Sequence, residues 1–392
     1  MRFELDNIVY EEKKNELLAD LESENIEALC LFNPTYIKRL TGFPFTPTER
    51  PIVYVLDQES ESVVIPSLEK EHIEVRDIEF DEVVTYPDYP GEKHPMIYIK
   101  NIIDKKDYNT IAVDQDGYSS GYGYFGPSLS DLADAEIKNI CFKLEKFFSV
   151  KHDQEIELLK ESAKWENLGM SYLQEETKLG LSEIEISMNA SLKASNAFIR
   201  TLGQKFEQSG EFPISAAFHG QVGKDTALPH AIATNKTIKE GDVLINYSHS
   251  EIGGYHSELE RTWIVGKPSK KQRKYFNLAV RAQDIAFDKV EAGVKLSEVD
   301  KTVEKMYEKE GIKDTWRHHT GHGLGTRIHE PPFIDRGEDM ILKENMVFSI
   351  EPGIYVKDFA GFRHSDTIVV KKNGIERITY YPRDLESNTI YV

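Results

Sequence analysis

The sequence predicts two domains, an α/β domain followed by a larger α+β domain, and three observations support this prediction. The chain has 392 residues, which is longer than a single domain with one hydrophobic core usually is. In the first half, short β-branched apolar segments alternate with segments of helical periodicity, which is typical of an α/β layer. In the second half, two long helical patterns precede strands with further helices between them. The composition changes near residue 147, so we expect domains over 1–147 and 148–392.

The elements of the first domain are predicted from its apolar runs. A surface helix over 9–23 leads into a buried strand over 26–32, which Asn33-Pro34 ends. Further strands are expected over 51–56, 62–65, 78–86, 110–113 and 137–140, and helices near 67–75, 95–104 and 126–135.

The second domain is predicted to begin with two long helices. Asp153 can cap a helix that runs to about residue 176. Gly180-Leu-Ser-Glu183 indicates a turn with a capping box into a helix that ends near residue 202. Strands are then expected around 216 and over 243–248, 255–265, 346–351 and 367–370, with helices over 270–292 and 296–310.

Composition argues against several classes of protein. With 48 basic and 67 acidic residues the net charge is −19, which disfavours nucleic acid as a partner. The N-terminus lacks the pattern of a signal peptide, and no apolar run reaches the roughly 18 residues that span a bilayer, so we expect no membrane association. Cys30 and Cys141 lie in apolar runs and are expected to be free thiols, which indicates a cytoplasmic protein.

One stretch of the second domain concentrates histidines. His318, His319, His322 and His329 lie within twelve positions of a chain that has twelve histidines. Glycines 321, 323 and 325 allow the backbone to approach a ligand closely. Histidine is suited to metal ligation or proton transfer near neutral pH. The alternative is a polar, glycine-rich loop with no chemical role.

Carboxylates occur where the strand pattern calls for apolar residues. Strand alternation places His256, Glu258, Glu260 and Thr262 on one face. Two carboxylates on one face repel each other, so one could hold a proton and act as a general acid; the alternative is the solvent-facing side of an edge strand. Glu351, in an apolar run before Pro-Gly, would require a charge partner or a metal if buried, or could form a structural salt bridge.

Four segments together resemble the catalytic domain of the pita-bread hydrolases, which include Xaa-Pro aminopeptidases, prolidases and creatinase. They read GDVLIN…GYHSELERT, GHGLGTRIHEPP, SIEPGIY and GFRHSDTIVV. The first domain, with Glu49-Arg50-Pro51, is similar to the creatinase-type N-terminal domain. The resemblance covers essentially the whole chain and implies an α/β creatinase-type domain followed by an α+β pita-bread catalytic domain.

The metallopeptidases among these relatives hold two divalent ions with two aspartates, a histidine and two glutamates. The resemblance places the histidine on His322 and the first glutamate on Glu351. The aspartates fall on Asn246 and Glu258, with one extra residue in the loop before Glu258, and the last glutamate falls on Ser365. Amide and hydroxyl oxygens are weaker ligands than carboxylates for hard cations, so we expect the two-metal site to be disabled. One ion (Mn, Co, Zn or Fe) on Glu258, His322 and Glu351 remains an alternative.

Other departures resemble creatinase, which hydrolyses a C–N bond without metal. They are Asn246, Glu260 within Leu-Glu-Arg-Thr, His230 in the place of the general base and acid, and Arg50 in the place of a substrate-contacting arginine from the partner subunit. Glu258 and Ser365 differ from creatinase, and the GHGLG and HEPP segments are closer to the peptidases.

From this resemblance we expect a metal-independent hydrolase of a small cationic or cyclic amidino-type compound, similar to creatinase or ectoine hydrolases, with no cofactor. His230 would activate water and protonate the leaving nitrogen. Glu260 and Glu351 would bind the cationic group, and His322 and His329 would stabilise developing charge. Arg50, Glu258 and Arg363 would contribute to substrate binding. His318 and His319 are expected to be structural.

Two alternatives remain at this point. One is an Xaa-Pro aminopeptidase or dipeptidase with an altered one-metal site and a short-peptide substrate. The other is an inactive pita-bread protein that binds a peptide or partner. The resemblance also implies a homodimer, in which Arg50 reaches the site of the partner subunit.

Overall fold

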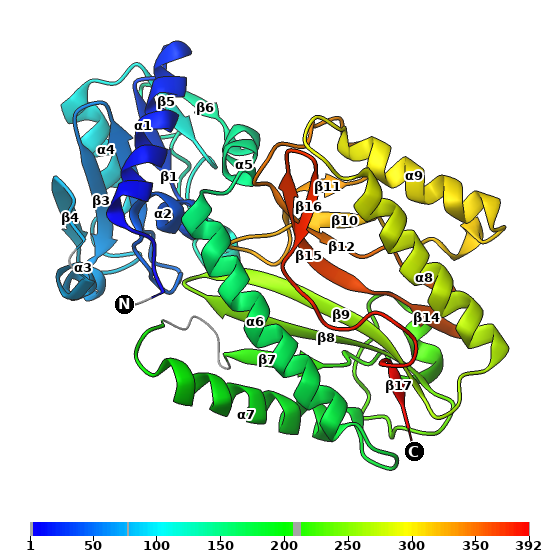
Figure 1. Cartoon of the computed structure of the whole chain (residues 1–392). Helices are drawn as coiled ribbons and strands as arrows, with labels where there is room; N and C mark the ends of the chain where they lie inside the picture. Colours follow the sequence, from blue (N-terminus) through cyan, green and yellow to red (C-terminus); the bar gives the residue numbers. More distant parts are fainter. Residues whose placement is uncertain (1–2, 77, 207–212, 392) are drawn as a thin grey trace. The chain divides into compact units, whose positions relative to one another are not determined.

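The computed structural model describes residues 3–76, 78–206 and 213–391 and divides the chain into two compact units (Figure 1). One unit is Leu5–Phe147, and the other is Phe148–Val392 together with Met1–Glu4. Within the described residues, no helix has the length and apolarity needed to cross a membrane.

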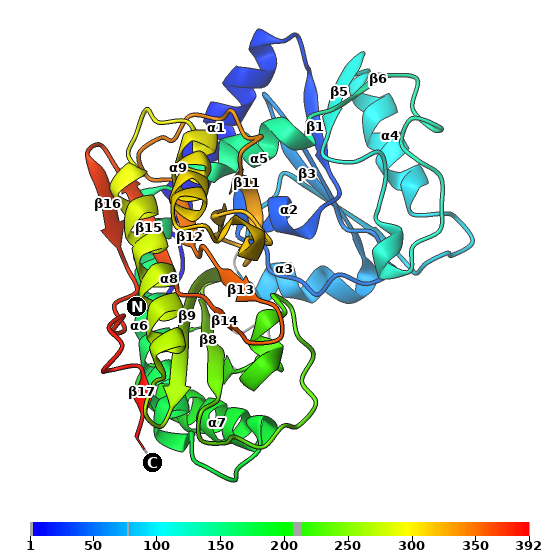
Figure 2. The same cartoon turned by 90° about the vertical axis from the view of Figure 1, so that its right-hand side faces the viewer.

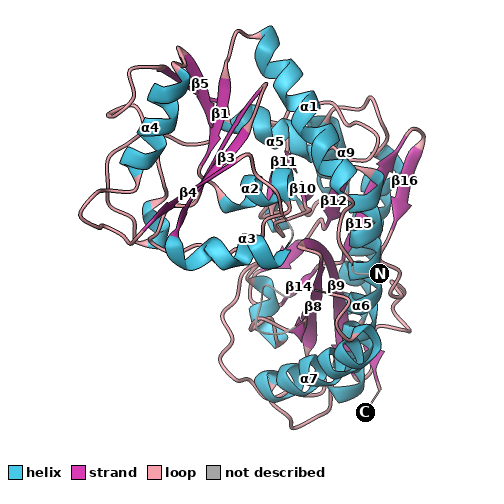
Figure 3. Cartoon of the chain, turned by 90° about the vertical axis from the view of Figure 1, so that its left-hand side faces the viewer, coloured by secondary structure: helices cyan, strands magenta, loops and turns pink. Residues whose placement is uncertain are grey.

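The N-terminal unit is built on a six-stranded sheet of order β4-β3-β2-β1-β5-β6. Its strands are β1 (Ala28–Leu31), β2 (Val53–Asp57), β3 (Glu61–Pro66), β4 (Glu82–Tyr86), β5 (Thr110–Val113) and β6 (Glu136–Asn139). Its helices are α1 (Asn7–Ser23), α2 (Pro34–Thr41), η1 (Ser67–Glu69), α3 (Lys70–Arg76), α4 (Met96–Lys106) and η2 (Ser120–Tyr122), with α5 (Cys141–Ser149) at its end. Strand β2 is antiparallel to its neighbours and the other pairs are parallel. Helices α1 and α4 lie on opposite sides of the sheet (Figure 3).

The helix expected over 126–135 is wrong, and two helices were missed. Residues 126–135 form turns in which side chains satisfy the backbone; Asp116 Oδ1, for example, accepts from Ser130 N at 2.9 Å. Asn33-Pro34 ends β1 but also starts α2, because Asn33 Oδ1 accepts from Thr35 N at 2.9 Å and proline is well suited to the first turn. Helix α5 follows β6 directly and was not predicted.

The C-terminal unit is built on a nine-stranded sheet whose main path is β11-β10-β12-β15-β9-β8-β7. The strands of this path are β7 (Ile214–Ala217), β8 (Val243–Ile252), β9 (Tyr255–Val265), β10 (Gly321–Gly323), β11 (Glu330–Ile334), β12 (Val347–Ile350) and β15 (Ser365–Lys371). Strand β16 (Gly374–Arg377) pairs with β15, and β17 (Thr389–Ile390) pairs with β9. A separate two-stranded sheet is formed by β13 (Ile354–Val356) and β14 (Ala360–Phe362).

The helices of this unit are α6 (Asp153–Glu176), α7 (Glu183–Leu202), η3 (Gly223–Ala227), α8 (Lys270–Lys289), α9 (Leu296–Lys309) and η4 (Lys313–Thr315). Asp153 is the first residue of α6 rather than its cap. The cap is His152, whose ring accepts from Gln154 N at 3.1 Å while Glu155 Oε2 accepts from His152 N at 2.7 Å. Ser182 caps α7, as the turn signal predicted.

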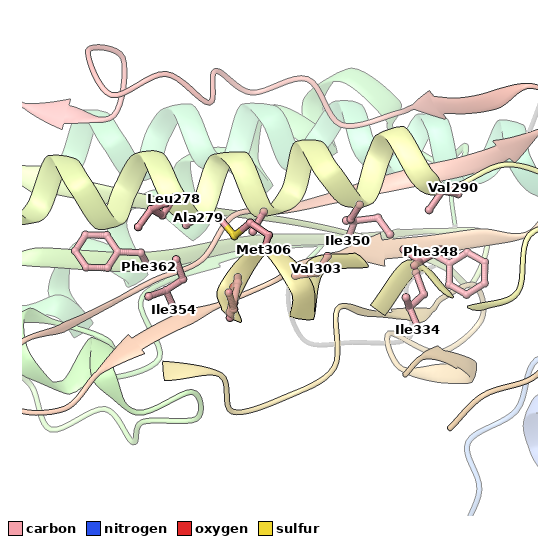
Figure 4. Close-up of a cluster of buried hydrophobic side chains, with 14 of the residues drawn as sticks. Leu278, Ala279, Val290, Val303, Met306, Ile334, Phe348, Ile350, Ile354 and Phe362 are labelled. Carbon is pink, nitrogen blue, oxygen red and sulfur yellow. The ribbon is translucent and has the colours of Figure 1, made fainter. Parts of the chain in front are cut away.

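Two helix pairs bury different parts of the sheet. Helices α8 and α9 lie side by side (Figure 2) and pack on β12 and its neighbours through the side chains labelled in Figure 4, among them Leu278, Val303, Met306, Phe348 and Ile350. Helices α6 and α7 cover β7, β8 and β9 through Met170, Leu173, Ile186 and Ala190, which pack with Leu244, Leu259 and Trp263. Leu244, Leu259 and Trp263 therefore mark the helix-covered face of β8 and β9.

Candidate active site

Strand β9 carries two carboxylates to the face that α6 and α7 leave uncovered. Glu258 and Glu260 alternate with Leu259, so they share the opposite face, as the strand pattern predicted. They are 8% and 7% exposed, and β9 lies between β8 and β15. The edge-strand alternative is therefore excluded.

Strand β10 holds His322 close to these carboxylates. The glycines on either side of His322 make this close packing possible. A Cβ at Gly321 would collide with the carbonyl oxygen of Ser349, and one at Gly323 would lie 2.6 Å from the carbonyl oxygen of Glu330. Glycine thus lets β11 and β12 close on both sides of β10, and the His322 ring is fully buried. The His329 ring stacks on it, with centroids 3.8 Å apart and planes at 14°.

The His322 ring presents an unpartnered nitrogen to two carboxylates. Its Nδ1 lies 3.1 Å from the carbonyl oxygen of Gly323, which can only accept, so Nδ1 donates and Nε2 keeps its lone pair in the neutral ring. Among the residues that the structure describes, Nε2 has no hydrogen-bond partner; it lies 3.6 Å from Glu258 Oε2 and 3.5 Å from Glu351 Oε1. Three electron-rich atoms that face one another are stabilised by a positive charge, which a proton or a metal cation can supply.

The spacing of these atoms fits a divalent cation. A tetrahedral ion with bonds of about 2.1 Å separates its ligand atoms by about 3.4 Å, close to the two distances from Nε2. Glu258, His322 and His329 offer ligand atoms within 4.8 Å of one another, and so do Glu258, Glu260 and Glu351. The residue types and their spacing are therefore compatible with a metal.

Serine hydroxyls hold the second oxygen of Glu258. Glu258 Oε1 accepts from Ser349 Oγ at 3.0 Å and from Ser365 Oγ at 2.8 Å, and the two hydroxyls are 2.6 Å apart. Burial acts to raise the pKa of Glu258, but His322 and Ser365 outweigh it and hold this pKa below its usual value. Glu258 is thus fixed with only Oε2 free for a cation.

Glu260 is bound to Arg363. The guanidinium donates through Nε to Glu260 Oε2 and through Nη2 to Glu260 Oε1 at 2.6 Å, and Nε lies 3.6 Å from Glu351 Oε2. Burial raises the pKa of Glu260, and burial together with Glu258 raises that of Glu351 well above its usual value. The fork of Arg363, expected to bind substrate, is therefore occupied by Glu260.

The strand register separates Asn246 from the site. Asn246 pairs with Arg261 and so shares the helix-covered face with Leu259, where its two side-chain polar atoms are buried without partners. Tyr247 pairs with Glu260 and lies on the face of Glu258 and Glu260. If the first metal-binding position is placed on Tyr247, the loop before Glu258 no longer contains an extra residue. The assignment of the first metal-binding position to Asn246 is wrong by one residue, which reverses the face in a strand.

Other predicted residues lie around this centre or outside it. His230 is exposed, and its charge contributes to lowering the pKa values of His219, His318 and His329, which places it near them. Arg50 belongs to the N-terminal unit, where its Nε donates to Asp88 Oδ1 at 2.9 Å and its Nη1 to Glu49.

His318 and Tyr355 join the site although sequence reasoning gave them no role. His318 Nε2 is 2.8 Å from Tyr355 Oη, to which Arg363 Nη1 donates at 2.9 Å. Burial and the Arg363 charge lower the pKa of His318 to about 3, so this ring is neutral. Tyr355 stood within the SIEPGIY motif, but only the structure brings it to Arg363.

Comparison with known proteins identifies the family. Residues 157–372 match the metallopeptidase family M24, and residues 14–126 match the creatinase/prolidase N-terminal domain. The chain belongs to metallopeptidase family M24 and is a hydrolase of the creatinase and Xaa-Pro peptidase superfamily with the pita-bread fold.

Several Xaa-Pro dipeptidases are similar to this chain, some of them along nearly its full length. The chain is 28% identical to the Xaa-Pro dipeptidase of Lactobacillus helveticus over 372 residues, 93% of this chain and 96% of the relative. It is 36% identical to the Xaa-Pro dipeptidase of Pyrococcus furiosus over 163 residues, 42% and 47% of the two chains. The solved Xaa-Pro dipeptidase from Bacillus anthracis superposes with a TM-score of 0.81 at 26% identity, covering 96% of this chain and 99% of that one.

These findings correct two expectations. The expected metal-independent hydrolysis of an amidino-type compound is wrong, because the relatives are Xaa-Pro dipeptidases in a family of metallopeptidases. The expectation of no cofactor is wrong for the same reason, and Glu258, His322 and their neighbours form a group able to hold a metal. The expectation of a metal-free site failed because the replacement of carboxylate ligands was interpreted as loss of all metal binding. A short-peptide or small-molecule substrate fits this family.

Proposed function

We propose that the protein is a metal-dependent dipeptidase that cleaves Xaa-Pro dipeptides with a single divalent cation. One observation carries the proposal: the buried, unpartnered Nε2 of His322 lies 3.6 and 3.5 Å from oxygens of Glu258 and Glu351. The Xaa-Pro dipeptidases that match almost the whole chain support the choice of substrate.

The ligand set supports one cation rather than two. Glu258, His322 and Glu351 would hold it, since Nε2 of His322 lies 3.6 and 3.5 Å from oxygens of the two carboxylates. Tyr247 stands on the site face where the first aspartate is expected, and a phenol is not a carboxylate ligand. Ser365 stands at the last glutamate position and is engaged with Glu258. Two of the carboxylates that the metallopeptidase pattern uses for two ions are therefore replaced, at Tyr247 and at Ser365.

When bound, the cation would polarise the scissile carbonyl and lower the pKa of a water molecule. Glu351 would accept the proton of the attacking water, since its Oε1 lies 3.5 Å from His322 Nε2, beside the position where the cation would be held. Glu258 is held in one orientation by Ser349 and Ser365, which would keep the attacking geometry fixed.

Two histidines on the open side are placed to serve the leaving group. Hydrolysis of an Xaa-Pro bond releases the proline nitrogen, which must gain a proton. His230 is exposed and neighbours His329 and His318, so we assign it this proton transfer. His329 would donate a hydrogen bond to the substrate while its ring rests on His322.

A homodimer in which Arg50 completes the partner's site, and a cytoplasmic location, stay predictions. Cys30 and Cys141 are free thiols, which is compatible with a reducing compartment. Analytical ultracentrifugation of the full chain would test the dimer.

The function is tested by cleavage of a panel of Xaa-Pro dipeptides by protein loaded with Mn²⁺, Co²⁺ or Zn²⁺. We expect release of free proline, loss of activity with EDTA and recovery on adding metal. His322→Ala should reduce kcat/KM by roughly 10² or more, because it removes a ligand. His72→Ala is the matched control, since His72 is an exposed histidine of the N-terminal unit and should leave the rate unchanged.

Two results would contradict the proposal. One is the absence of proline release from the whole panel with every metal. The other is a rate that neither EDTA nor His322→Ala changes.

A further inference from the structure

Arg363 is fully engaged inside the site. Beyond its two bonds to Glu260 and the one to Tyr355 Oη, Nη1 donates to the Pro229 carbonyl at 3.3 Å and Nη2 to Gln221 Oε1 at 3.4 Å. Its side chain is 7% exposed. The guanidinium therefore has a fixed position and is not free to reach a substrate.

The charges around it are unbalanced. Glu258, Glu260 and Glu351 bring oxygen atoms within 4.8 Å of one another, against the single positive charge of Arg363. Glu351 lies between two positions: Oε1 is 3.5 Å from His322 Nε2, and Oε2 is 3.6 Å from Arg363 Nε. One position, beside His322, has the donors for a divalent cation. The other is already filled by the guanidinium.

Glu260 determines this arrangement. In β9 it binds the guanidinium through both of its carboxylate oxygens. Tyr247, paired with Glu260 across the strands, adds a second bulky group on the same face. A hydroxyl could not hold Arg363 in a bidentate ion pair.

We propose that Arg363, held by Glu260, is a built-in cation that takes the place of a second divalent ion. The Glu260–Arg363 pair is then the determinant of metal stoichiometry, and the site combines one metal ion with one guanidinium. This inference concerns the site of the proposed peptidase and rests on metal binding there, but not on which substrate is cleaved.

The experiment is Mn²⁺ titration of the metal-free protein by calorimetry, with metal content measured after dialysis. The wild type should bind one ion. Arg363→Met removes the charge and leaves Glu260 and Glu351 facing the vacated position, so it should bind two. Arg363→Lys is the matched control, because it keeps the charge, and should bind one. Two ions in the wild type, one ion in Arg363→Met, or two ions in Arg363→Lys would overturn the proposal.

Glu260→Thr gives a second test if Arg363→Met does not fold. Released from Glu260, the guanidinium can pair with Glu351, only 3.6 Å away, and compete with the metal. Mn²⁺ affinity should fall by roughly 10–100-fold while the stoichiometry stays at one. Unchanged affinity, or a second bound ion, would contradict the inference. Failure of Xaa-Pro cleavage with these stoichiometries intact would refute the proposed substrate and leave the inference standing.

Discussion

Two buried arginine–carboxylate pairs lie on opposite faces of the same strands. On the helix-covered face, Arg261 of β9 meets Asp366 of β15 at 2.9 Å. On the site face, Glu260 is bound by Arg363. Glu260 and Arg261 are adjacent in β9, so their side chains serve different faces; Asp366 lies in β15, and Arg363 lies between β14 and β15.

The two pairs differ in how their charges are balanced. Arg261 also donates to the carbonyl oxygens of Glu260, Ser365, Tyr381 and Pro382, and Asp366 accepts from Thr379 Oγ1 and Gln283 Nε2. Both side chains are 0% exposed. On the site face, Arg363 contacts Glu260 and Glu351, and Glu258 brings a third carboxylate within 4.8 Å of these two. The Arg261–Asp366 pair, whose charges are balanced, stabilises the sheet. The excess of buried carboxylates near Arg363 instead indicates a binding site for a cation.

The largest effect is expected from breaking the balanced pair. Arg261→Met leaves Asp366 buried without its charge partner, which should reduce the free energy of unfolding by about 3–5 kcal/mol. Urea denaturation would measure the loss, which should be the same with and without Mn²⁺. A loss that added metal restores would show that this pair belongs to the site.

The next comparison tests the strand register with two neighbouring substitutions. Asn246→Asp places a second buried carboxylate opposite Arg261, whose guanidinium is already bound to Asp366, and should destabilise the fold by about 2 kcal/mol without changing Mn²⁺ affinity. Tyr247→Asp adds a carboxylate on the face of Glu258 and should strengthen Mn²⁺ binding. Calorimetry and urea denaturation of both variants would decide the register; stronger binding in Asn246→Asp alone would contradict it.

A third test uses pH. The pKa of Glu351 is raised above its usual 4.5 in the metal-free fold, so the folded state binds this proton more tightly than the unfolded state. Its contribution to stability is therefore lost as pH rises above the usual 4.5, and Tm in EDTA should fall more steeply with rising pH in the wild type than in Glu351→Gln. Saturating Mn²⁺ should flatten the wild-type profile because it replaces the proton. Parallel profiles in EDTA would argue against a buried, protonated Glu351.

The smallest effect is expected at Ser365. Ser365→Ala removes one hydrogen bond to Glu258 but leaves Ser349, so stability should fall by about 1 kcal/mol. Mn²⁺ affinity should fall less than in His322→Ala. A loss of affinity equal to that of His322→Ala would mean that Ser365 is itself a ligand.

The sequence predicted most strands, the long helices and the shared face of Glu258 and Glu260, because these depend on local periodicity. It could not determine the partners of Arg363, which involve Glu260, Tyr355 and Gln221 from separate segments. It placed Asn246 in the site because a one-residue shift in a strand changes the face without changing the motif. The replaced ligands were interpreted as loss of metal binding, because the number of carboxylates in a sequence does not give the distances between the ligand atoms that remain.

The most direct test of a single-cation site is anomalous diffraction from crystals of the full chain soaked in Mn²⁺. The account predicts one peak per chain, at bonding distance from His322 Nε2, Glu258 Oε2 and Glu351 Oε1, with Arg363 still bound to Glu260. Two peaks in the site, or one peak away from His322, would contradict it.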